Sequence, residues 1–192
     1  MATEAQSSSG DAVQRDREEI LARHKDWWEA NAGLDIPRMA NCFPKGMNYL
    51  MFNLNGHPYF GLDEKVKLWE WYTDQLDIAM GDIRIMKFEI SGDMAWIGSE
   101  GIFPLRLIGA EGTGSETWQV DNTDNQHDPF RLRATEVYQR DDGEGKPVWK
   151  MWHFHASPLP PEDEKRPCFD DTAAERGLGS NPWGEPLRVV GT

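Results

Sequence analysis

The sequence predicts one α+β domain in which three N-terminal helices pack on a curved, cone-shaped antiparallel sheet. Two observations predict this fold class. Apolar residues have helical spacing in the first part of the chain and alternate in the later part, as they do in strands. The sheet must bury one face, and the amphipathic helices are the only cover that the predicted elements offer. A bent sheet wrapped on helices leaves internal space, so we expect a pocket there.

The first helix is predicted over residues 11–32. Val13, Ile20 and Trp27 recur at seven-residue intervals and define one apolar face. Residues 1–10 are polar and rich in serine, and we expect them to form a disordered leader outside the domain.

Two further helices follow in the first half of the chain. Asp35 caps a short second helix, and Asp63 caps a third helix that extends to about residue 76. Between them, residues 47–53 have the composition of a strand. The Asn-Gly pair at 55–56 then predicts a tight turn into a second short strand.

The rest of the domain is predicted to be a four-stranded meander. A slip in the alternation over residues 82–90 indicates a β-bulge. Residues 111–128 are rich in Gly, Thr and Asn, and we expect a long loop there. The domain is therefore predicted to cover residues 11–158, and residues 159–192 to form an extended arm on the domain or on a partner subunit. The four strands are expected at residues 82–90, 94–108, 130–140 and 147–157.

The composition excludes several classes of partner. The formal net charge is −13, whereas nucleic-acid binding needs clustered Lys and Arg. No apolar run reaches the roughly 18–20 residues that span a membrane, and no signal-peptide pattern is present, so we expect a cytoplasmic protein. The two cysteines, Cys42 and Cys168, lack metal-binding spacing, and we expect neither a disulfide nor a zinc site.

Aromatic residues are unusually frequent, with nine Trp and eight Phe. Because rings line ligand pockets well, we expect the pocket to bind a small hydrophobic or aromatic molecule. Tyr49 and Asn53 share one strand face and would hydrogen-bond a hydroxyl or carbonyl group of that molecule. The alternative is that rings at helical or strand spacing belong to the core. The candidates for an aromatic box are Trp28, Trp69, Trp96 and Trp152.

Three segments of the chain resemble the nuclear-transport-factor-2-like (NTF2-like) superfamily, in its SnoaL-like polyketide cyclase and ketosteroid isomerase branch. They are EANAGLD, YFGLDEKVKLWEWY and RATEVYQRDDGEGKPVWKMWHFHASP. The last is the most specific, since it is close to a recurrent Arg-x-Thr…Trp…His-x-His-x-Ser-x-Pro pattern of that branch. The resemblance covers residues 14–158 and implies the α+β cone, a pocket between helices and sheet, and a homodimer.

The same resemblance implies chemistry without a cofactor. Members of this branch include isomerases, cyclases, dehydratases, epoxide hydrolases and lyases, and also plain binding modules. Cofactorless lyases of lignin-derived diaryl compounds would suit so many rings, but no motif selects them, and fold does not fix function.

One departure from the family pattern changes the expected chemistry. Ketosteroid isomerases carry a catalytic Asp on the first strand, where this chain has Phe52 or Asn53. Neither side chain accepts a proton as a carboxylate does, so that route is not expected here. The family's pocket-facing Tyr on the first helix corresponds to Asp26 or Trp27, and Asp26 would be a displaced acid or base.

The two histidines of the last strand are the leading catalytic candidates. His153 and His155 are two residues apart and therefore share one face of the strand. If that face lines the pocket, one imidazole would transfer a proton and the other would orient the substrate. The alternative is a structural role or a place at a dimer surface. A metal site needs a third ligand, which the local sequence does not supply.

Three more polar residues are candidates for the site. Arg133 would hold an oxyanion and Glu136 would act as a base, unless the two form cross-strand ion pairs on the solvent face. His24 lies on the apolar stripe of the first helix, where a histidine is either a hydrogen-bonded core residue or a pocket residue.

These observations predict a cofactor-independent lyase, dehydratase or isomerase acting on a small hydrophobic, aromatic hydroxy or carbonyl compound. The alternative is a non-catalytic module of the same fold that binds a small molecule or associates subunits.

Overall fold

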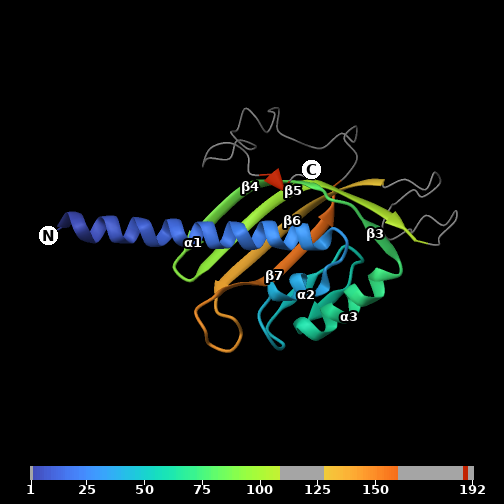
Figure 1. The fold of residues 1–192 in the computed structure, drawn as a ribbon, viewed down its shortest axis with the longest axis horizontal. Coiled ribbons are helices and arrows are strands. Elements are labelled where there is room, and N and C mark those ends of the chain that lie inside the picture. The colour runs from blue at the N-terminus through green and yellow to red at the C-terminus, as the bar shows by residue number, and fades with distance from the viewer. Residues whose placement is uncertain (1, 109–127, 160–187, 190–192) are drawn as a thin grey trace.

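The computed structural model describes residues 2–108, 128–159 and 188–189, and Figure 1 shows their arrangement. The helices are α1 (Ala2–Asn31), α2 (Ile36–Asn41) and α3 (Gly61–Thr73). The strands are β1 (Leu50–Phe52), β2 (Pro58–Phe60), β3 (Leu76–Ile78), β4 (Asp82–Ser91), β5 (Met94–Leu107), β6 (Asp128–Arg140), β7 (Trp149–Pro158) and β8 (Arg188–Val189).

The described strands form one curled sheet with the order β2-β1-β7-β6-β5-β4-β8, and β3 pairs with the end of β5. The predicted α+β cone is confirmed. The sheet is mixed rather than purely antiparallel, because β1 runs parallel to β7. These two strands are far apart in the sequence, so no hairpin turn fixes their relative direction.

Helix α1 crosses strands β4–β7, and α2 and α3 lie beside its C-terminal end (Figure 1). Ile20, Trp27 and Trp28 bury the apolar face of α1 as predicted, whereas Val13 is exposed. The helix begins at Ala2, so residues 2–10 continue α1 and the expected disordered leader is wrong for them. Adding residues to an existing helix is far easier than nucleating one, which allows a polar segment to continue it.

Two irregularities interrupt the ladders of the long strands. The predicted bulge in β4 is confirmed, since the register against β5 shifts between Ile85 and Lys87. A second shift, between β6 and β7, pairs Val137 with His153 and Tyr138 with Met151, which leaves Trp152 as an extra residue in β7. A bulged residue changes which face the following residues occupy.

Helix α3 begins at Gly61, two residues before the predicted cap at Asp63. Phe60 is the N-cap residue, and its backbone N–H donates to Glu64 Oε2 at 2.7 Å. Gly61 has φ +75°, and a Cβ there would lie 2.9 Å from Met47 Sδ. Only glycine adopts this conformation without strain, so it defines where the helix starts.

The end of α3 and the C-terminal region differ from the expected pattern. α3 ends at Thr73, and the chain enters β3 where the helix was expected to finish. Most of the predicted loop over residues 111–128 and of the arm over residues 159–192 lies outside the described residues. Within the arm, β8 pairs antiparallel with β4. No helix among the described residues is long and apolar enough to cross a membrane.

Candidate functional site

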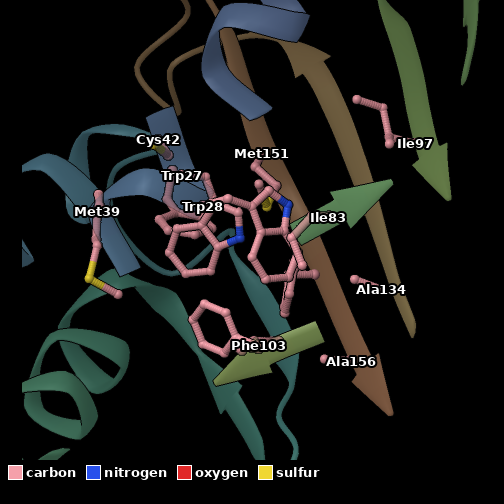
Figure 2. Close-up of a cluster of buried hydrophobic side chains, with 14 of the residues drawn as sticks. Trp27, Trp28, Met39, Cys42, Ile83, Ile97, Phe103, Ala134, Met151 and Ala156 are labelled. Carbon is pink, nitrogen blue, oxygen red and sulfur yellow. The ribbon is translucent and has the colours of Figure 1, made fainter. Parts of the chain in front are cut away.

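An internal pocket lies between α1, α3 and the sheet. Its empty volume is about 530 Å³, counted together with its open mouth. Figure 2 shows the neighbouring indoles of Trp27 and Trp28 and the ring of Phe103, whose centroid lies 5.6 Å from that of Trp28. Four polar side chains interrupt a wall that is otherwise built mainly from rings and aliphatic groups. They are Asn31, Asn53, Lys65 and Tyr72.

The amino group of Lys65 is the most unusual feature of the pocket. Lys65 lies one turn after the start of α3 and is only 1% exposed. Its Nζ atom is 3.5 Å from Asn53 Oδ1 and about 5 Å from the ring centroids of Tyr59 (5.3 Å) and Trp69 (5.2 Å). Burial lowers the pKa of Lys65 well below its ordinary value, because the charged form loses its hydration.

Within the described part of the chain, no carboxylate forms an ion pair with Lys65. Asn53 makes the second polar contact of the pocket, since its Nδ2 donates to the Tyr72 hydroxyl at 2.8 Å. Burial raises the pKa of Tyr72, although the hydrogen bond from Asn53 opposes this shift. The hydroxyl therefore stays protonated at neutral pH and can donate to a ligand oxygen.

Directly behind one wall of the pocket lies a separate polar cluster, which we call the Glu136 cluster (His24, Trp28, Glu136 and Tyr138). Glu136 is fully buried, and His24 Nδ1 is 2.9 Å from each of its carboxylate oxygens. Trp28 Nε1 donates to the same carboxylate at 2.9 Å, and the Tyr138 hydroxyl donates at 2.5 Å. Three donors from α1 and β6 thus satisfy one buried carboxylate.

The cluster is closed off from the pocket by the indole of Trp28, which belongs to both. Its ring lines the pocket, while its N–H donates to Glu136. Burial, together with the Glu136 charge, raises the pKa of Tyr138 well above its ordinary value. Tyr49 is also fully buried, and its pKa is raised for the same two reasons. Both hydroxyls therefore hold their protons, but Tyr138 donates its proton to Glu136, whereas the Tyr49 hydroxyl has no hydrogen-bond partner among the described residues.

Comparison with known proteins identifies the architecture. No family model matches the chain, and a search of curated proteins finds no match. A ketosteroid isomerase-like protein from Erwinia carotovora atroseptica has a TM-score of 0.55 at 14% identity, over 75% of this chain and 96% of that one. The chain has the NTF2-like fold.

Two further solved structures have the same fold as this chain. A provisionally assigned dehydratase of the NTF2-like family from Streptomyces avermitilis gives a TM-score of 0.56 at 16% identity, covering 78% of this chain and 99% of that one. A provisionally assigned aromatic ring hydroxylase from Novosphingobium aromaticivorans gives a TM-score of 0.55 at 15% identity, covering 77% of this chain and 91% of that one. Identities this low establish the shared fold alone.

Strand β7 places His153 and His155 outside the pocket, contrary to the expectation. Phe154 and Ala156 line the pocket instead. The extra residue Trp152 explains the difference, because Met151 and Phe154 both point inward across the bulge. His155 is exposed, and His153 is half-buried with its Nδ1 3.0 Å from the Leu50 carbonyl oxygen.

Four other candidates lie outside the pocket. Arg133 pairs with Glu100 across β5 and β6 at 2.6 Å, which is the cross-strand ion pair given above as the alternative. Asp26 is bound by the Arg38 guanidinium at 2.5 Å beside α2. Trp96, Trp152 and Asp26 do not line the pocket.

All the remaining candidates except Tyr49 are buried in the pocket or in the Glu136 cluster. Trp28, Asn53 and Trp69 line the pocket, and Trp28 also joins His24 and Glu136 in the cluster. Tyr49 is buried against Phe43 with ring centroids 4.3 Å apart. No group of three or more metal-ligating side chains occurs in the described ranges. Burial raises the pKa of the Cys42 thiol to about 12, so that thiol is unreactive as a ligand or nucleophile.

Sequence reasoning did not select Lys65 or Tyr72. A signal was present, since Lys65, Leu68, Trp69 and Tyr72 have the spacing of one helix face and are all buried. A lysine in register with an apolar stripe predicts a buried amine, and that spacing would have identified it.

Proposed function

We propose that this protein is a cofactor-independent acid–base enzyme that binds a small hydrophobic, aromatic hydroxy or carbonyl compound in the internal pocket. The reaction class is a lyase, dehydratase or isomerase step. One observation carries the proposal: the buried Lys65 amine and the Tyr72 hydroxyl both contact the side chain of Asn53 on an aromatic wall.

The chemistry follows from the protonation state of each group. Because burial lowers its pKa, the Lys65 amine is available as a neutral proton acceptor. The Tyr72 hydroxyl and the Asn53 amide are neutral donors that hold a ligand oxygen as negative charge develops on it. Trp27, Trp28 and Trp69 restrict water, which strengthens these contacts.

The solved structures of this fold support the same reaction classes. One is named as ketosteroid isomerase-like and another is a provisionally assigned dehydratase. Both classes move a proton next to a carbonyl or hydroxyl carbon, which is the chemistry available to an amine beside two oxygen-holding groups.

Deuterium exchange tests the proposal directly. In D₂O, we expect the protein to catalyse incorporation of deuterium at the carbon next to the carbonyl of phenylacetone, measured by NMR. Lys65→Met should reduce this rate by about 100-fold or more, because methionine keeps the shape and removes the base. Lys67→Met is the matched control, since Lys67 is exposed on the same helix.

The alternative is a non-catalytic binding module of the same fold. In that case aromatic ketones and alcohols would quench tryptophan fluorescence in the wild type, and neither exchange nor product would be detected. Such a result would contradict the enzyme proposal while leaving the pocket as a ligand site.

A further inference from the structure

We propose that the Lys65 amine forms a covalent imine with the ligand, and that the substrate class is therefore an aldehyde or ketone attached to a ring. This inference rests on the proposed function of the same pocket. It adds a bond-forming role for a group that acid–base chemistry alone would use as a proton acceptor.

The first argument is the setting of this amine compared with two exposed, ion-paired lysines. Lys45 pairs with Glu144 at 2.7 Å, and Lys87 pairs with Glu89 at 2.7 Å. Lys65, by contrast, is 1% exposed, and its contacts are one long hydrogen bond to an amide oxygen and the rings of Tyr59 and Trp69. A buried amine without a carboxylate partner has a less stabilised charged form, so its neutral form, which carries the nucleophilic lone pair, is favoured.

The second argument is the position of the neighbouring donor. The Asn53 side chain contacts Lys65 Nζ through Oδ1 and the Tyr72 hydroxyl through Nδ2. The amine and the hydroxyl therefore contact opposite ends of one amide group. In the proposed complex the carbonyl carbon lies beside Nζ, and its oxygen is directed toward the Asn53 amide and the Tyr72 hydroxyl.

The third argument is the surface that receives the rest of the ligand. Trp27, Trp69 and Phe154 line the same pocket, and the Trp69 ring lies 5.2 Å from the amine. These rings hold an aromatic or alicyclic group by burial and ring contacts, and they contain no carboxylate that would compete for the amine.

The step balances without any oxidant or reductant. The nitrogen lone pair attacks the carbonyl carbon, the N–C bond forms, and the carbonyl π electrons move to oxygen. A proton passes from nitrogen to that oxygen to give a carbinolamine. Loss of the hydroxyl group with one further proton releases water and leaves the C=N bond. Protonation of this imine draws electrons from the adjacent carbon, which favours removal of its proton or cleavage of the next C–C bond.

Burial supports the same assignment through the protonation state. Because it lowers the pKa of Lys65, a larger fraction of this amine is neutral near pH 7 than of an exposed lysine.

Reductive trapping tests the inference on the full-length chain. We would incubate the protein with benzaldehyde and sodium cyanoborohydride at pH 7 and locate the added benzyl group by peptide mass mapping. We expect one adduct per chain, on Lys65, with labelling of Lys67 at least about tenfold weaker, since each pKa unit changes the neutral fraction about tenfold. Lys65→Met should abolish the main adduct, and Lys67→Met should keep it.

Mapping the adduct in the wild type keeps the test decisive even if Lys65→Met folds poorly. Labelling spread over exposed lysines would overturn the inference. So would the absence of labelling at Lys65 while phenylacetone exchange continues, and in that case the acid–base proposal would survive. If neither labelling nor exchange occurs, both proposals fail.

Discussion

Two buried ionisable groups, Glu136 and Lys65, occupy neighbouring regions of the same cone and have opposite surroundings. Glu136 is fully buried and accepts hydrogen bonds from an imidazole, an indole and a phenol. Lys65 is equally buried but has one amide oxygen at 3.5 Å. Burial alone therefore does not make a reactive group. The number and quality of its partners decide whether a buried charge stabilises the fold or remains available for chemistry.

The largest expected effect is on the Glu136 cluster. Glu136→Ala should lower the free energy of unfolding by about 3–5 kcal/mol, because it leaves three buried donors without their acceptor. Urea denaturation measures this. The matched control is Thr135→Ala on the exposed face of the same strand, with an expected change within about 0.5 kcal/mol. A small effect of Glu136→Ala would mean that the cluster is hydrated and does not differ from the pocket.

The next effect concerns one tyrosine hydroxyl in each region, Tyr138 as a donor to Glu136 and Tyr72 as an acceptor from Asn53. Tyr138→Phe should cost about 1.5–3 kcal/mol, because a fully buried carboxylate loses one of its hydrogen bonds. Tyr72→Phe should cost less in urea denaturation, because Asn53 lines the pocket and can bond to water there. If the two substitutions cost the same, the proposed difference in solvation between the regions is wrong.

Lys65→Met should stabilise the protein, in a pH-dependent way. Burial lowers the pKa of Lys65 in the folded chain, so between that pKa and the ordinary value of 10.5 the unfolded chain binds more protons. Wild-type stability therefore rises with pH in this window, and the variant lacks the rise. We expect the variant to be more stable by about 1–2 kcal/mol at pH 7, with a smaller gap at pH 9.5. If the difference in free energy of unfolding between the variant and the wild type does not change with pH, the pKa of Lys65 is not lowered by folding.

The smallest effect is expected on the outer face of β7. His155→Ala should change stability by no more than about 0.5 kcal/mol and leave phenylacetone exchange unchanged, because His155 is exposed and outside the pocket. The measurement is the exchange rate relative to the wild type. A decrease in the exchange rate of more than tenfold would show that the histidines of β7 contribute to the reaction, and it would contradict the role proposed for Lys65.

Much of the fold could be predicted from local patterns. The apolar spacing of α1, the cap at Asp35 and the bulge in β4 each follow from a few neighbouring residues, and each is present in the structure. The start of α3 was missed because it depends on a long-range fit of Gly61 against Met47. Local capping preference favoured Asp63, but tertiary contact decided the boundary.

The site was harder to predict because its parts meet across the fold. Glu136 and His24 were both candidates, yet they are separated by 112 residues, and no sequence spacing shows that they touch. The two histidines of β7 were predicted on the wrong face of the strand, and a single residue accounts for the error. If the side chains of β7 alternated strictly from Trp149 and Met151, those of His153 and His155 would face the pocket. The bulged residue Trp152 shifts the alternation by one, so the histidines occupy the opposite face.

The indole of Trp28 limits which molecules fit against its part of the pocket wall. Because its N–H is held from behind by Glu136, the ring cannot turn aside for a longer ligand without breaking that bond. This part of the wall is therefore fixed. Compounds enlarged on the side that faces Trp28 should be rejected.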